Sequence, residues 1–102
     1  MSRVIVQYKV WPEQAGHNEN LIRAVYAELA AAKPDGFRYA TVKLDDGVTF
    51  VHIAERSGPG DNPLTKLAAF AEFQRGIAER CEEPPVVRQA TLVGSFRLFS
   101  GD

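Results

Sequence analysis

A short turn near the middle of the chain, Asp45-Asp46-Gly47, constrains the fold more than any other feature of the sequence. Gly accepts the positive φ values that tight hairpin turns require, and Asp-Gly is typical of a type I′ turn. On both sides of the turn, over 37–44 and 48–56, apolar and polar residues alternate as they do in strands. The sequence therefore predicts two antiparallel strands joined by a hairpin.

A strand and a helix are predicted before this hairpin. Residues 4–11 alternate between an apolar set and a mixed set, and Pro12 ends the strand. A helix is expected from His17 or Asn18 to a stop signal at 33–36, because apolar residues recur along it at every fourth position, as Leu21, Val25 and Leu29.

A second helix and a last strand are predicted after the hairpin. Asn62-Pro63 is a good N-cap and first-turn pair, and apolar residues follow it at helical spacing as far as Ile77. Pro84-Pro85 is expected to end this helix before a long strand from Val86 to Phe99. The order βαββαβ predicts a ferredoxin-like α+β fold, in which two helices cover one face of a four-stranded antiparallel sheet.

Composition limits the functions that such a chain can have. Its 102 residues carry 12 Lys and Arg against 13 Asp and Glu, which leaves no excess of basic residues for nucleic acid. The single cysteine, Cys81, permits no intrachain disulfide and indicates a reducing compartment. No segment approaches the ~20 apolar residues of a membrane span. We expect one cytoplasmic domain over residues 1–102, without nucleic-acid or membrane partners.

The first candidate for a functional residue is His52, within the strand that follows the hairpin. It shares a strand face with Phe50 and Ala54, so a titratable ring points toward an apolar surface. With an unperturbed pKa of about 6.5, it could act as a general base or as a hydrogen-bond donor. The alternative is a buried histidine at a dimer interface, with its hydrogen bonds satisfied.

The second candidate is Gln7, on the mixed face of the first strand. In the predicted fold this strand lies beside the strand of His52, so the amide could orient His52 or a ligand oxygen. A hydrogen bond across the sheet is the alternative. A metal site is not expected, because His17 and His52 lie on separate elements and have no further ligands at a suitable spacing.

Three aromatic residues, Trp11, Tyr39 and Phe50, could form the walls of a pocket for a flat aromatic ligand. Tyr39 would also supply a hydroxyl group. The alternative is that they belong to the core or to an interface.

The sheet face that the helices leave open is expected to be apolar. Its predicted members are Ile5, Trp11, Phe37, Tyr39, Phe50 and Val93. An exposed apolar surface of this size usually marks an interface or a ligand site. We therefore expect two copies of the chain to pair sheet to sheet.

Three segments resemble the antibiotic biosynthesis monooxygenase-like group of dimeric α/β-barrel proteins. They are the opening Val-Ile-Val-Gln-Tyr-Lys-Val-Trp-Pro-Glu, the Asp-Asp-Gly turn with Thr-Phe-Val-His-Ile-Ala-Glu after it, and the helix Leu-Ala-Ala-Phe-Ala-Glu-Phe-Gln. The resemblance implies a homodimer in which two ferredoxin-like sheets face each other and form a dimeric α/β barrel. It also implies a pocket in each subunit, between the sheet and its helices or neighbouring loops.

The group includes cofactor-free quinol-type oxygenases, haem-degrading enzymes and isomerases. The haem-degrading members use an Asn, a Trp and a helix-borne His, whereas here position 7 is Gln and the second helix has no His. We therefore expect no haem. The sequence has no flavin or nicotinamide fingerprint either, so we expect no other cofactor. The resemblance implies a cofactor-independent monooxygenase of a small aromatic or quinol-type substrate. In that hypothesis His52 accepts a phenolic proton and Gln7 positions a carbonyl or peroxide.

The alternative hypothesis is a non-catalytic dimer. Such a dimer would bind a small hydrophobic molecule or support another protein. The two hypotheses differ in whether the bound compound is chemically changed.

Overall fold

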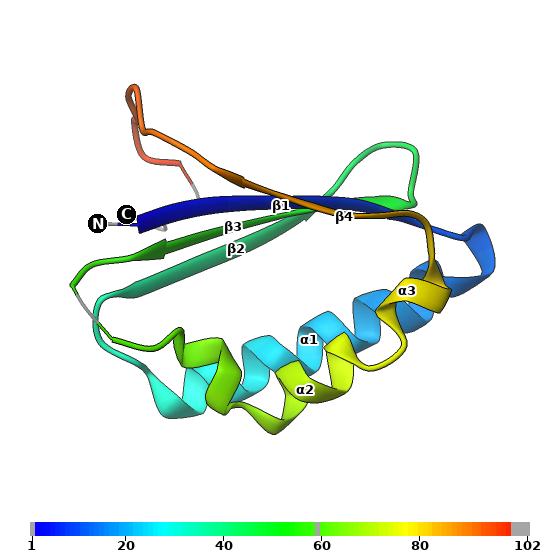
Figure 1. Ribbon diagram of the computed structural model, residues 1–102, viewed down its shortest axis with the longest axis horizontal. Coiled ribbons are helices and arrows are strands. Elements are labelled where there is room, and N and C mark those ends of the chain that lie inside the picture. Colours follow the sequence, from blue (N-terminus) through cyan, green and yellow to red (C-terminus); the bar gives the residue numbers. More distant parts are fainter. Residues whose placement is uncertain (1, 59, 99–102) are drawn as a thin grey trace.

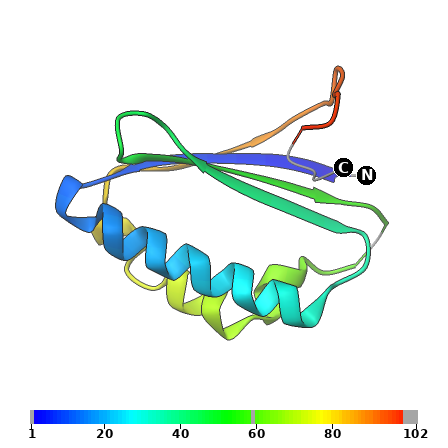
Figure 2. The same cartoon turned by 180° about the vertical axis from the view of Figure 1, so that it is seen from behind.

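The computed structural model describes residues 2–58 and 60–98 (Figure 1). Its antiparallel sheet has the strand order β2-β3-β1-β4, formed by β1 (Ser2–Val10), β2 (Phe37–Lys43), β3 (Thr49–Arg56) and β4 (Cys81–Gln89). The described helices are α1 (Ala15–Ala32), α2 (Ala68–Gln74), α3 (Ile77–Arg80) and the short 3-10 helices η1 (Pro12–Gln14) and η2 (Pro63–Lys66). The helices lie on one face of the sheet and leave the other face open (Figures 1 and 2). The predicted ferredoxin-like α+β fold is confirmed.

The hairpin between β2 and β3 forms as predicted, but its turn is of another kind. The Gly47 N–H donates to the Leu44 carbonyl oxygen at 3.0 Å, and the Leu44 N–H donates to the Thr49 carbonyl oxygen at 2.9 Å. The loop therefore contains the four residues 45–48, and within it only Gly47 has a positive φ, +77°. A type I′ turn needs two consecutive positive φ values, so that prediction is wrong.

The first helix begins earlier than predicted, and the second is interrupted. Helix α1 starts at Ala15, directly after η1, and ends where the stop signal predicts, with Lys33 at a φ of +45°. The second predicted helix is divided into η2, α2 and α3. Leu67 is extended between η2 and α2, and Gly76, at a φ of +73°, separates α2 from α3.

The last strand also has other bounds than predicted. β4 begins at Cys81, includes Pro84 and Pro85, and ends at Gln89. It pairs with β1 alone, so it is an edge strand, where proline is tolerated because one side of the backbone needs no ladder hydrogen bond. Residues 90–98 form no strand, and the expected end of the strand at position 99 lies outside the described residues.

The register of β1 and β3 determines which side chains point toward the helices. His52 lies opposite Val6, and Phe50 lies opposite Tyr8. Paired residues of an antiparallel sheet point to the same face, and Tyr8 is buried beneath the helices with 2% of its surface exposed. The face of β3 that carries His52 is therefore the covered face.

The predicted composition of the open face is largely wrong. Phe37, Tyr39 and Phe50 belong to the covered face, because they pair with Arg56, Ala54 and Tyr8. Trp11 and Val93 lie beyond the ends of β1 and β4. Of the predicted members only Ile5 is on the open face, where the strands also place Ala40, Val42, Val51, Ile53 and Val86.

In the part of the chain that the structure describes, no helix is both long and apolar enough to cross a membrane.

Candidate functional site

His52 is the centre of a buried polar network beneath the sheet. Only 4% of its surface is exposed, and its ring packs on those of Tyr8, Tyr39 and Phe73, with centroid distances of 5.3, 5.8 and 5.6 Å. The Tyr8 hydroxyl lies 2.8 Å from Nε2. On the other side of the ring, the hydroxyl oxygens of Tyr39 and Thr41 lie 2.8 and 3.0 Å from Nδ1. Both ring nitrogens therefore have hydrogen-bond partners.

The network extends from Tyr8 toward the junction of α3 and β4. Asn18, which is fully buried on α1, donates from Nδ2 to the Tyr8 hydroxyl oxygen at 3.0 Å. Arg80 donates from Nε to the Asn18 Oδ1 at 3.1 Å, and from its other nitrogens to the carbonyl oxygens of Arg75 and Phe73 at 2.9 and 2.6 Å. Four buried donor and acceptor groups from β1, β3, α1 and α3 are thus joined in one path.

On the Nδ1 side the network ends on helix α1. The Tyr26 and Thr41 hydroxyl oxygens are 2.8 Å apart, and the Tyr26 ring stacks on Tyr39 with a centroid distance of 5.4 Å. Helix α1 therefore contacts the network at both ends, through Asn18 and Tyr26.

Burial determines the charge state of these groups. It lowers the pKa of His52 to about 4, because a charged imidazolium loses its hydration. It raises the pKa of the hydroxyls of Tyr8 and Tyr39 above the ordinary tyrosine value for the same reason. At pH 7 the ring is therefore neutral with a single N–H, and both tyrosines keep their protons.

A cavity of about 390 Å³ lies between the sheet and α2, with His52, Tyr8 and Tyr39 in its wall. The remaining wall is mainly apolar and includes Val4, Val6, Phe37, Phe70, Phe73 and Ile77. This volume lies within the usual range of small-molecule sites, and a few polar groups in an apolar wall are typical of them. The cavity and the network together form the candidate site.

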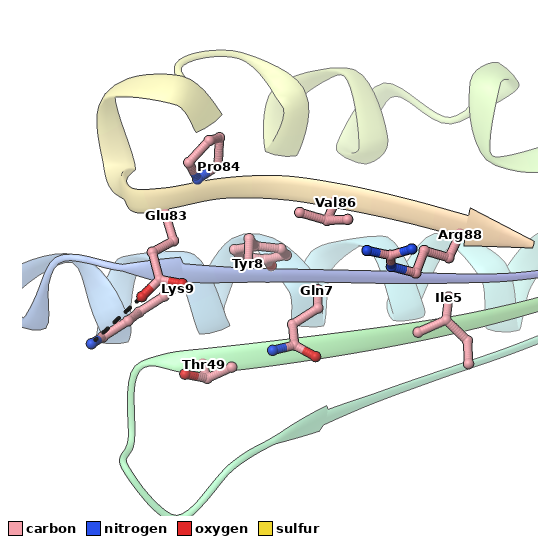
Figure 3. Close-up of a pocket in the computed structure, with 9 residues that line it drawn as sticks. All are labelled: Ile5, Gln7, Tyr8, Lys9, Thr49, Glu83, Pro84, Val86 and Arg88. Carbon is pink, nitrogen blue, oxygen red and sulfur yellow. Dashed lines mark ion pairs between the residues drawn. The ribbon is translucent and has the colours of Figure 1, made fainter.

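Gln7 does not belong to this site. It lies opposite Val51 in the register, one position after Val6, so its side chain points to the open face, away from His52. Figure 3 shows Gln7 among side chains of that face, between Ile5 and Lys9 along β1. The hypothesis that its amide orients His52 is therefore wrong, because neighbouring residues of a strand point to opposite faces.

The structure separates the three aromatic residues that were expected to form a pocket. Tyr39 lines the cavity. Trp11 is 43% exposed at the start of η1 and is not among the lining residues, so the expected role in the pocket is not supported. Phe50 is 1% exposed and stacks on Tyr8 with a centroid distance of 5.7 Å, which makes it a core residue.

Of the network, the prediction from sequence named only His52 and Tyr39, and it missed Tyr8, Asn18, Tyr26, Thr41 and Arg80. Asn18 and Arg80 show what the sequence could and could not reveal. Asn18 precedes Ile22 by four residues and Val25 by seven, which places it on the apolar stripe of α1, where a polar side chain needs a buried partner. That signal was available in the sequence. The sequence contains no such signal for Arg80, because this residue lies near Glu79 and Glu82 in a segment that is typical of a solvated charged surface.

A metal site is not indicated either. His17 is exposed on α1, and within residues 2–58 and 60–98 no group of three or more His, Cys, Asp or Glu side chains could hold a metal ion.

Comparison with known proteins shows which proteins share the fold of this chain. No protein-family model matches the sequence, and no curated protein matches it. Solved structures do match. A Nitrosomonas europaea protein, provisionally named an antibiotic biosynthesis monooxygenase, has a TM-score of 0.75 at 16% identity, over 92% of this chain and 100% of the other.

Two further solved structures have the same fold. Rv0793 from Mycobacterium tuberculosis has a TM-score of 0.69 at 17% identity and covers 92% of this chain and 96% of its own. SnoaB from Streptomyces nogalater, a cofactor-independent oxygenase, was solved as a mutant and has a TM-score of 0.62 at 14% identity, over 92% of this chain and 94% of its own. The resemblance in the sequence is thus confirmed at the level of fold: this chain has the fold of the antibiotic biosynthesis monooxygenase-like proteins.

Proposed function

We propose that this protein is a cofactor-independent monooxygenase of a small aromatic or quinol-type substrate, which it binds in the cavity beneath the sheet. The observation that carries the proposal is the buried His52 in the wall of a 390 Å³ cavity that is otherwise mainly apolar. The fold shared with a cofactor-independent oxygenase supports it.

The proposed reaction converts a ring CH₂ into a carbonyl. Loss of one proton from a substrate whose CH₂ is conjugated to a carbonyl or phenol gives an electron-rich anion, which adds O₂ at carbon. The resulting peroxide takes up a proton and loses water, so one substrate and one O₂ give one carbonyl product and one water. Four electrons pass from the substrate carbon to oxygen. An apolar cavity favours these steps because it keeps water from the anion and the peroxide.

His52 is the proton acceptor in this scheme, and Tyr8 connects it to the cavity. The Tyr8 hydroxyl is 2.8 Å from Nε2 and its residue lines the cavity, so Tyr8 can pass its proton to the ring while it takes one from the substrate. Because burial disfavours the charged ring, the proton returns readily to the peroxide.

An oxygen-consumption assay tests this function. We would use naphthalene- and anthracene-type quinols with their keto tautomers, and ¹⁸O₂ to follow the inserted atom. Turnover should fall at least about 100-fold in a folded His52→Gln variant, as loss of a general base requires. Trp11→Phe, at a position outside the cavity wall, should keep full activity. Unchanged turnover in His52→Gln would exclude His52 as the base.

We also propose that the protein works as a homodimer joined through the open face of the sheet. Five aliphatic side chains gather there from four strands, namely Ile5, Val42, Val51, Ile53 and Val86, and no helix covers them in the described structure. A second copy would bury them against an identical face, which agrees with the arrangement that the sequence resemblance implies.

One observation favours the second candidate, a dimer that binds a small hydrophobic molecule without changing it. Both ring nitrogens of His52 already have tyrosine hydroxyl groups as hydrogen-bond partners, and burial keeps the ring neutral. Mass spectrometry of compounds recovered after incubation separates the two functions. A compound returned unaltered under O₂ by wild-type protein would support binding alone.

A further inference from the structure

We propose that Arg80 sets the direction of the hydrogen bonds in the buried network, so that Tyr39 offers its hydroxyl proton to the cavity and favours ligands with an acceptor oxygen. The inference rests on the proposed function only for the place of the ligand, which is the same cavity. Arg80 and Asn18 are positioning residues in this proposal, Tyr8 carries the proton in the proposed function, and Tyr39 donates to the ligand.

The direction begins at Arg80, because a guanidinium group donates hydrogen bonds and cannot accept them. Its Nε donates to one end of the Asn18 amide, which must therefore be the oxygen, Oδ1. The other end, Nδ2, carries only hydrogens and lies 3.0 Å from the Tyr8 hydroxyl. Tyr8 consequently accepts a hydrogen bond from Asn18.

Tyr8 has one proton, and its position decides the form of His52. The remaining partner of the Tyr8 hydroxyl in the described structure is Nε2 of His52, at 2.8 Å. If Tyr8 donates to Nε2, that nitrogen is bare, and the neutral ring carries its hydrogen on Nδ1. The Nδ1–H then donates to the oxygens of Tyr39 and Thr41, at 2.8 and 3.0 Å.

In the opposite arrangement, the buried Tyr8 proton has no hydrogen-bond acceptor in the described structure. If Nε2 carried the hydrogen, the Tyr8 proton would have no acceptor among the described residues, in a side chain that is only 2% exposed. A buried donor without a partner destabilises a fold, because it has lost its hydrogen bond to water and gained none in return. In the proposed arrangement the remaining proton belongs to Tyr39, which is half-buried and lines the cavity.

The Thr41 hydroxyl has other hydrogen-bond partners besides Tyr39. It shares a 2.8 Å hydrogen bond with Tyr26 and faces Nδ1 of His52. Thr41 also forms a hydrogen bond with the Tyr39 hydroxyl. When Tyr26 donates to Thr41, Thr41 donates in turn to the Tyr39 oxygen, and the Tyr39 proton is left to donate to a ligand. Burial raises the pKa of Tyr39, so its hydroxyl remains a donor at neutral pH.

A donor in an apolar cavity defines a ligand class. It favours a flat aromatic compound that bears a ketone or phenolate oxygen, and it discriminates against a hydrocarbon of the same shape. For the proposed reaction, the same hydrogen bond would stabilise the oxygen on which the anionic charge of the deprotonated substrate resides.

The first test is the tautomer of His52, measured by long-range ¹H–¹⁵N correlation spectroscopy. The chain has 2 His, so the variant His17→Gln leaves His52 as the single histidine and assigns its signals. We expect the Nδ1–H tautomer in this protein. An Nε2–H tautomer would overturn the proposal.

Asn18→Asp tests the role of Arg80 with little change of shape. An aspartate accepts from both Arg80 and Tyr8, so the Tyr8 proton turns away from His52. The ring should then change to the Nε2–H tautomer, and Nδ1 should accept the Tyr39 proton. If the tautomer stayed Nδ1–H in folded Asn18→Asp, Arg80 and Asn18 would not set the direction.

The ligand class is tested with 9-fluorenone and fluorene, two flat tricyclic probes that differ by one carbonyl. Wild-type protein should bind fluorenone about fivefold more tightly, the effect of about one neutral hydrogen bond. Both Tyr39→Phe and Asn18→Asp should lose this preference and keep their affinity for fluorene. Equal affinity of wild-type protein for the two probes would refute the role of Tyr39.

These readouts are independent of turnover. If the tautomer and the fluorenone preference are as expected but no substrate is oxidised, the proposed function fails and the inference stands. If a substrate is oxidised while the tautomer is Nε2–H, the inference alone fails.

Discussion

The charge state of His52 couples the stability of this protein to pH. The folded chain holds the ring neutral with a pKa of about 4, whereas in the unfolded chain the ring has a pKa of 6.5. Between these values the unfolded state binds more protons than the folded state. The free energy of unfolding therefore falls as the pH falls from 6.5 to about 4, by up to about 3 kcal/mol from this ring alone.

Urea unfolding at pH 7 and pH 4.5 measures this effect. Wild-type protein should lose about 2–3 kcal/mol more between the two pH values than His52→Gln, which has no ring to charge. Groups such as Glu19, whose pKa is lowered to about 2 by hydrogen bonds from Arg23 and Lys43, titrate equally in both proteins. The same pH dependence in wild-type and variant would mean that His52 is not held neutral.

The elements of this fold depend on a few backbone positions that glycine alone occupies without strain. Gly47 closes the β2–β3 loop at a φ of +77°, and Gly36 precedes β2 at a φ of +70°. At Gly47 an added Cβ would meet no atom within 4 Å, but at Gly36 it would lie 2.7 Å from the Ser57 hydroxyl oxygen and 3.1 Å from the Ser57 carbonyl oxygen.

Three alanine substitutions separate these effects. Gly47→Ala should destabilise the protein by about 1 kcal/mol through its backbone conformation alone. Gly36→Ala should lower the free energy of unfolding by more than Gly47→Ala does, because its Cβ also contacts Ser57. Gly16→Ala, in α1 with no atom within 4 Å, should stabilise by about 0.5 kcal/mol. Chemical denaturation measures all three, and a destabilisation by Gly36→Ala no larger than that by Gly47→Ala would contradict the contact with Ser57.

At the scale of the whole molecule, the open face of the sheet decides whether two copies associate. Ile53 lies opposite Ile5 and Ala40 in the register, at the centre of that face. In sedimentation analysis, wild-type protein should be a dimer and Ile53→Lys a folded monomer, because a buried lysine loses its hydration. Ala30→Lys, at an exposed position of α1, should remain a dimer. A monomeric wild-type protein would exclude the proposed interface.

The order of elements, the hairpin and the alternation along each strand could be predicted from the sequence, because these follow from contacts between neighbours in the chain. The sequence could not determine which face of 37–43 is covered, since both faces carry apolar residues. Packing decided this. The register of β1 against β3, which places Val6 rather than Gln7 opposite His52, also formed only in the folded sheet. The hydrogen bond from Arg80 to Asn18 joins positions 62 residues apart, and local patterns carry no information on such a contact. Only the tertiary structure could bring these groups together beneath the sheet.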